Sequence, residues 1–198
     1  MLTFCCMIGD MNILTLPYIL LVIVGVLAIW FIVTYNRFVG GANRIAEAWS
    51  DIEVQLKRRY DLIPNIVETV KGYAAHERET LDSVTQARTQ AMGAQTPEQR
   101  TQAENTLTNT LKTLFAVSEN YPDLKANANF LDLQRELADT ENKIQAARRF
   151  YNGNVRDYNI SIESFPLNMI AGMFSFAKKD LFDLADNDAA QQPVKVAF

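Results

Sequence analysis

The sequence predicts an all-α protein, in which an N-terminal transmembrane helix precedes an antiparallel, up-down-up-down four-helix bundle. Residues 11–36 carry no charge. After them, apolar residues recur at spacings of three and four, and short breaks divide this repeat into four stretches. Helices joined by short connections pack antiparallel. We expect a short N-terminal tail at 1–12, the membrane helix at 13–34, the bundle at 37–162, an apolar segment at 163–179 and an acidic, partly disordered tail at 180–198.

The membrane helix is predicted from the length of an uninterrupted apolar run. The apolar run Ile13–Val33 has 21 residues, and a helix of that length spans about 31 Å, the thickness of a bilayer's hydrocarbon core. A buried core helix rarely runs this long without charge, and a cleaved leader would have a basic start and a small-residue cleavage site. The predicted anchor residues include aromatic side chains near the two ends of the run: Ile13, Tyr18, Trp30, Val33 and Tyr35.

Charge next to the run predicts the orientation. No Lys or Arg precedes the run, whereas Arg37 and Arg44 follow it closely. The positive-inside rule then places the N-terminus outside and the bundle in the cytoplasm. A membrane anchor could begin at Met11, so residues 1–10 are either a short N-terminal tail or an over-long start, and the sequence leaves both readings open.

The composition limits the classes of function. The net charge is -4, which disfavours bulk attraction to nucleic acid. Both cysteines, Cys5 and Cys6, lie ahead of the membrane run, where they can neither crosslink the bundle nor build a zinc cluster in it.

The four bundle helices are predicted near 37–60, 62–92, 97–119 and 127–162. Gly40-Gly41 is the weak joint between anchor and bundle. Pro64 either ends the first bundle helix or kinks one long helix. Gly93 followed by Thr96-Pro97-Glu98-Gln99 has the residues of a helix end and a capping box. In the last helix the apolar seam continues past Gly153, and one helical glycine costs only about 1 kcal/mol.

The apolar segment from Phe165 to Phe176 carries no charge and precedes Lys178-Lys179. Since the fourth bundle helix runs back toward the membrane, this segment arrives at the lipid surface. It is too short to span but long enough to lie in the interface. The alternatives are a contact with the membrane or another subunit, and a cap on the end of the bundle. The candidate contact residues are Phe165, Met169, Met173, Phe174 and Phe176.

No catalytic, cofactor-binding or metal site is predicted. The chain has one histidine, His76, and position 73 is tyrosine, so the Glu-x-x-His pairs of di-metal bundles are absent. Lys57, Arg58 and Arg59 form either a solvated basic turn or a patch for a protein partner. Polar residues crowd the second half of the last helix, where they either fix its register or pair with a neighbouring subunit: Asn142, Arg148, Arg149, Asn152, Asn154 and Asn159.

Two blocks of sequence resemble the bacterial LemA family. The first runs from Ala48 to Asn65 and continues from Val70 to Glu77; the second begins at Tyr121-Pro122-Asp123-Leu124 and ends at Phe165-Pro166. The resemblance implies an integral membrane protein of the bacterial inner membrane with a helical-bundle domain, and it brings no catalytic residue or cofactor. The segment Met1–Asp10 and Gly153 depart from the family pattern.

These observations together predict a non-enzymatic, membrane-anchored helical scaffold. Its expected partners are the lipid bilayer, further copies of itself and a possible protein partner, but no nucleic acid. The alternative is a membrane-tethered signalling adaptor whose bundle binds a partner.

Overall fold

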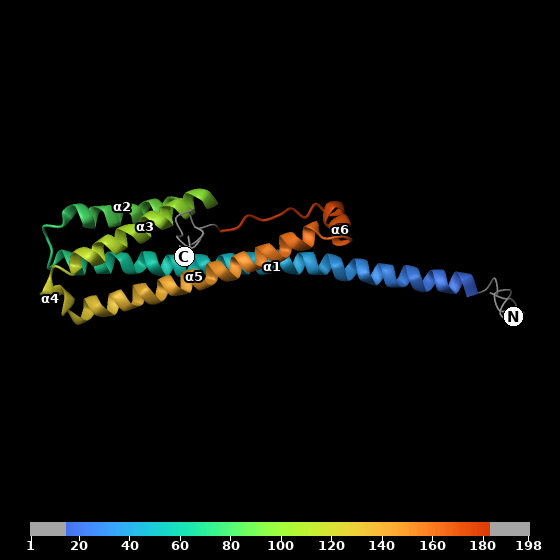
Figure 1. The fold of residues 1–198 in the computed structure, drawn as a ribbon, viewed down its shortest axis with the longest axis horizontal. Coiled ribbons are helices and arrows are strands. Elements are labelled where there is room, and N and C mark those ends of the chain that lie inside the picture. The colour runs from blue at the N-terminus through green and yellow to red at the C-terminus, as the bar shows by residue number, and fades with distance from the viewer. Residues whose placement is uncertain (1–14, 183–198) are drawn as a thin grey trace, which may run out of the picture. The chain divides into compact units, whose positions relative to one another are not determined.

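The computed structural model describes residues 15–182 and is all-helical over that range (Figure 1). The described residues form six helices and no strand, which confirms the predicted all-α class. The helices are α1 (Thr15–Lys71), α2 (Arg78–Gly93), α3 (Pro97–Ser118), α4 (Pro122–Lys125), α5 (Ala128–Glu163) and α6 (Leu167–Met173). Residues 1–14, which include the predicted anchor residue Ile13, and residues 183–198 of the tail lie outside the described range.

The chain divides into two compact units. Among the described residues, the first unit holds 15–44 and 157–179, and the second holds 45–156 and 180–182. α6 belongs to the first unit, whereas α2, α3 and α4 belong to the second.

α1 joins two elements that the sequence analysis kept apart. It runs without a break from Thr15 to Lys71, through Gly40-Gly41 and through Pro64. Pro64 therefore does not end a helix, and the predicted boundary at 60–62 is wrong. The predicted helix 62–92 is instead the end of α1, a connection at residues 72–77, and α2.

The connection at 72–77 lies inside the predicted helix 62–92, and its polar residues contact distant parts of the chain. The hydroxyl of Tyr121 donates to a carboxylate oxygen of Glu77 at 3.0 Å, and the side-chain amide of Asn127 donates to the hydroxyl of Tyr73 at 2.9 Å. Ala74, which lies between Tyr73 and Glu77 in the sequence, is buried. These contacts fix the connection against the chain around α4.

The bounds of α3 and α5 lie within one residue of the predicted helices 97–119 and 127–162. The Thr96 hydroxyl oxygen accepts a hydrogen bond from the Gln99 N–H, and the side-chain oxygen of Gln99 accepts one from the Thr96 N–H. These two bonds complete the capping box at the start of α3. α5 passes through Gly153 and ends at Glu163. The short helix α4 lies in the gap between the predicted helices 97–119 and 127–162.

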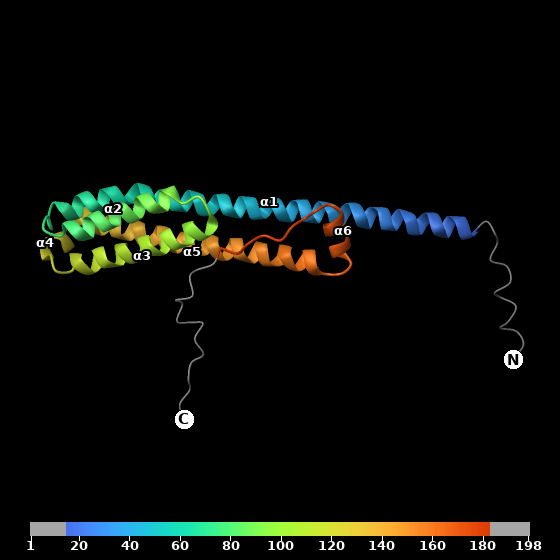
Figure 2. The same ribbon diagram turned by 90° about the horizontal axis from the view of Figure 1, so that it is seen from above.

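The second unit is held by one hydrophobic core. Figures 1 and 2 show α2, α3 and the neighbouring parts of α1 and α5 side by side. Every helix of this unit contributes buried apolar residues to the core: Ile63, Ile66 and Val70 from α1, Leu81, Val84, Ala87 and Ala91 from α2, Leu107, Leu111 and Leu114 from α3, Leu124 from α4, and Phe130 and Leu137 from α5. Burying such side chains is the main force that stabilises helices of this length.

Candidate functional site

The N-terminal part of α1 presents an uncharged surface. Residues 17–30 are all exposed. Within the part of the chain that the structure describes, α1 is the one helix long and apolar enough to cross a membrane, judged by length and composition. The four described anchor residues lie along it with exposed side chains: Tyr18, Trp30, Val33 and Tyr35. This exposure distinguishes α1 from the core helix of a soluble protein, which would be mostly buried.

In the same unit, the chain after α6 packs against α1. The ring of Phe174 lies 5.7 Å from that of Phe31 and 4.8 Å from that of Tyr35, and the ring of Phe176 stacks on Phe38 at 5.1 Å. Two of the five predicted contact residues therefore touch α1. The other three, which are more exposed, are Phe165, Met169 and Met173.

Gly41 has a structural role that differs from the predicted weak joint. A Cβ atom at position 41 would lie 2.9 Å from Cδ2 of Tyr158, whereas one at Gly40 would meet nothing within 4 Å. The buried Tyr158 ring also makes an edge contact with Phe38, at 6.2 Å between centroids. Glycine at 41 therefore allows α5 to approach α1 closely within this unit.

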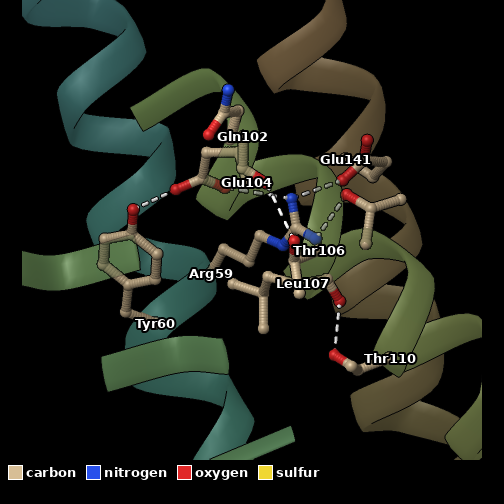
Figure 3. A network of polar contacts seen from close by, with 9 residues as sticks. Arg59, Tyr60, Gln102, Glu104, Thr106, Leu107, Thr110 and Glu141 are labelled. Carbon is tan, nitrogen blue, oxygen red and sulfur yellow. Dashed lines mark hydrogen bonds and ion pairs between the residues drawn. The ribbon is translucent and has the colours of Figure 1, made fainter. Parts of the chain in front are cut away.

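A buried ionic network occupies the second unit (Figure 3). Nη1 of Arg59 lies 3.4 Å from Oε2 of Glu104 and 3.0 Å from Oε2 of Glu141, and Nη2 donates to the hydroxyl of Thr108 at 2.8 Å. The side chains of Arg59 and Glu104 are 2% and 0% exposed, and that of Glu141 is 30% exposed. Since these residues come from α1, α3 and α5, one guanidinium joins three helices.

Two further groups adjust the electrostatics of this network. Tyr60 donates its phenolic hydrogen to the second oxygen of Glu104, and burial together with the Glu104 charge raises the Tyr60 pKa above its ordinary value. Arg148 is 7% exposed, and burial lowers its pKa. The negative charges of Glu104 and Glu141 oppose this shift. Arg59 pairs with both carboxylates, and Arg148 adds a second guanidinium whose charge they also feel. The two carboxylates and two guanidiniums leave the charge of this region close to balanced.

The same region explains how α1 continues through Pro64. Proline has no N–H, so the carbonyl of Tyr60, four residues earlier, lacks its helical donor. Nε of Arg88, on α2, donates to this carbonyl at 2.7 Å. A side chain from a second helix thus satisfies a backbone group that Pro64 leaves free.

A clamp on α5 holds the end of the described chain. The side-chain amide of Asn152 donates to the carbonyl of Phe182 at 3.0 Å, and its oxygen accepts from the Phe182 N–H at 2.8 Å. The Phe182 ring lies 5.6 Å from Trp49 and 4.6 Å from the guanidinium of Arg148. Tyr151 also donates to the carbonyl of Asp180.

In the first unit, Asn159 makes the same paired contact with the N–H and carbonyl of Lys179. Two of the polar residues predicted to fix register or meet another subunit therefore hold this chain's own backbone. Arg148, a third member of that set, stacks on Phe182.

The predicted basic patch is divided. Lys57 and Arg58 are exposed, whereas Arg59 is buried in the ionic network and is not available to a surface partner. His76 is exposed in the connection before α2. Over residues 15–182, no three His, Cys, Asp or Glu side chains are grouped so that they could hold a metal ion.

The ionic network was not predicted, although the positions of its charged residues in the sequence indicate it. Arg59 follows Leu56 by three residues and precedes Ile63 by four, so it occupies a position of the apolar stripe rather than the polar face. Glu104 likewise precedes Leu107 by three residues, so it also occupies a position of an apolar stripe. A charged residue at a stripe position is buried, and a buried charge needs a partner.

Comparison with known proteins gives one family and several relatives. The model of the LemA family matches residues 48–198. The chain is 27% identical to Protein LemA of Metamycoplasma hominis, over 85% of this chain and 75% of that protein. It is 25% identical to Magnetosome protein MamQ 2 of Paramagnetospirillum magneticum, over 90% of this chain and 76% of that protein. It is 22% identical to Magnetosome protein MamQ of Magnetospirillum gryphiswaldense, over 84% and 72%.

Proposed function

This chain belongs to the LemA family, and from that premise we propose that it is a non-enzymatic, membrane-anchored helical scaffold. In this proposal the apolar part of α1 spans the bacterial inner membrane once. The second unit forms an antiparallel four-helix bundle on the cytoplasmic side, where it holds copies of itself or a partner protein.

The observation that carries the proposal is the change in side-chain exposure along α1. Residues 17–30 are uncharged and exposed, whereas Phe38, Ile45 and Ile52 are buried. An exposed apolar surface in water is unfavourable, but the same surface is stable in lipid. One helix thus combines a surface suited to lipid with a stripe that packs in a protein core.

Self-assembly is supported by apolar side chains on the surface of the second unit. Val54 on α1 and Phe150 on α5 are each 59% exposed. Side chains of this kind at the centre of a contact contribute to association between subunits. The rival function, a signalling adaptor, is favoured by the adjacent exposed cations Lys57 and Arg58, which suit an acidic partner.

Membrane anchoring is tested by placing a charge in the span. Ile23→Arg adds a cation to the middle of the apolar run, which opposes insertion by about 2.5–3.5 kcal/mol. The matched control is Met92→Arg, which adds the same charge to an exposed position of the second unit. Only Ile23→Arg should reduce the fraction of the chain that resists carbonate extraction, and equal extraction of both variants would contradict the anchor.

The scaffold and adaptor are separated by mass in detergent. A large, uniform oligomer that persists at high salt supports the scaffold, and a monomer supports the adaptor.

The orientation in the membrane needs a separate measurement. With Cys5 and Cys6 replaced by Ser, a cysteine at the exposed Gln95 should react with an impermeant thiol reagent only after lysis. Reaction in intact cells would place the second unit outside.

A further inference from the structure

α6 and the turn before it carry an exposed apolar face. Phe165, Met169 and Met173 are 80%, 65% and 69% exposed. Met169 and Met173 are four residues apart, so they share one face of the helix. The sequence from 165 to 177 contains no charged residue. Three large apolar side chains in one short segment form a patch that needs a nonaqueous neighbour.

The opposite face of α6 is already occupied within its own unit. Ile170 and Ala171 are buried. Phe174, four residues after Ile170, packs against Phe31 and Tyr35 of α1. The side of this segment that packs within the unit is thus distinct from its exposed apolar side. The exposed side is free to contact a different neighbour.

The position along α1 at which α6 lies indicates the chemical nature of that neighbour. Phe174 and Phe176, which directly follow α6, contact Phe31, Tyr35 and Phe38 of α1. At this level the uncharged run ends and Arg37 begins the charged sequence. Both ribbon views show α6 lying across α1 rather than along it (Figures 1 and 2). If α1 stands upright in a bilayer, a helix that crosses it at this level lies in the plane of the interface.

We propose that α6 and Phe165 lie at the boundary between headgroups and acyl chains, so that the chain holds one leaflet through a second apolar element besides α1. This inference depends on the proposed membrane anchor. Amphipathic segments bind at this boundary when an apolar face is flanked by cations. The exposed side chains of Lys178 and Lys179 supply such cations, and Lys178 also pairs with Glu163.

A single tryptophan at Met169 tests the proposal in the full-length protein. The native residues Trp30 and Trp49 are first replaced by Phe, and the protein is reconstituted in phosphatidylcholine vesicles. Lipids brominated at shallow or deep acyl positions report contact with lipid, and iodide reports contact with water. The matched control is a tryptophan at Met92, which is 55% exposed on α2. Met173→Trp repeats the test on the same face.

The expected result is a blue-shifted emission for Met169→Trp, with stronger quenching by shallow than by deep bromine and weak quenching by iodide. Met92→Trp should be quenched by iodide alone. Iodide quenching of both Met169→Trp and Met173→Trp would overturn the proposal. Protection from iodide without bromine quenching, lost when the protein is diluted in lipid, would instead show a contact between copies and would also overturn it.

The anchor is measured separately, which keeps the two proposals distinct. In a protein with Trp49→Phe only, bromine quenching of Trp30 reports insertion of α1. If Trp30 is quenched and Met169→Trp is not, the interfacial position of α6 fails while the anchor stands. If Trp30 is not quenched, the anchor itself fails.

Discussion

Replacing Arg59 by methionine should destabilise the second unit strongly. The guanidinium is 2% exposed and lies between Glu104, which is 0% exposed, and Glu141. Methionine keeps the apolar stem of the side chain but removes the charge and its hydrogen bonds. Glu104 is then a buried carboxylate that has lost its cation.

The magnitude follows from the burial of each partner. Removing one member of a buried ion pair costs about 3–5 kcal/mol. Glu141 is 30% exposed and can turn toward water, and Glu104 keeps the hydrogen bond from Tyr60. We therefore expect the lower end, about 3 kcal/mol. At a urea m-value of about 1–3 kcal/mol/M, this lowers the unfolding midpoint by about 1–3 M.

The assay is urea unfolding of the full chain in detergent, followed by fluorescence. With Trp30→Phe, Trp49 is the one remaining tryptophan, and it contacts Tyr151 and Phe182 in the second unit. Arg58→Met is the matched control, because Arg58 is exposed and should change the free energy of unfolding by less than about 0.5 kcal/mol. Adding Glu104→Gln to Arg59→Met should recover part of the loss. Equal midpoints for Arg59→Met and Arg58→Met would refute the buried network.

Four further predictions concern the free energy of unfolding, measured by the same urea assay unless another is named. Arg88→Met leaves the Tyr60 carbonyl without its donor and should cost about 1–3 kcal/mol; in a Pro64→Ala background, where a helical N–H returns, the cost should shrink, and an unchanged cost would contradict this role. Gly40→Ala should stabilise by up to about 1 kcal/mol, whereas Gly41→Ala should not, because its Cβ meets Tyr158; thermal unfolding followed by circular dichroism compares them, and an equal gain would refute the close contact. Because the Tyr60 pKa is raised in the fold, the neutral phenol is favoured, so this contribution is complete below about pH 10 and is lost as pH rises beyond it. Tyr60→Phe should therefore weaken the alkaline loss of stability, and an unaltered pH profile would count against it. Phe182→Ala removes a buried ring and should cost about 3 kcal/mol, whereas Leu181→Ala, at an exposed neighbour, should cost little; similar midpoints would argue against the clamp.

Periodicity predicted the helices well where their stripes are purely apolar. Leu107, Leu111 and Leu114 are buried on α3 as their spacing predicts, and Phe130 and Leu137 are buried on α5. The capping box at Thr96 and Gln99 was predicted because its hydrogen bonds are local. Local chemistry and a regular stripe are enough to place such elements.

The connection at 72–77 could not be predicted from spacing. Val70, Tyr73, Glu77 and Leu81 keep the three- and four-residue rhythm of a helix across it, so the stripe shows no interruption. What separates α1 from α2 is a set of contacts with distant residues, Tyr121 and Asn127. Tertiary contacts here override the local pattern.

The sequence left two outcomes open at Pro64, an end of the helix or one long helix, and the structure has one long helix. A proline inside a helix removes a hydrogen bond and often ends the helix. Here Arg88, 28 residues later in the sequence than Tyr60, supplies the missing donor. No local pattern relates these two positions, because their relation exists only once α1 and α2 pack together.

The ionic network shows why the stripe positions of charged residues carry information about pairing. Apolar residues at three- and four-residue spacing leave helices free to slide by whole turns, since each turn presents a similar surface. Arg59 and Glu104 interrupt that uniformity at buried positions of α1 and α3. A slide of one turn would leave a carboxylate and a guanidinium buried apart, at a cost of several kcal/mol. The buried charges therefore distinguish one alignment of the helices from its neighbours, which the hydrophobic stripe alone cannot do.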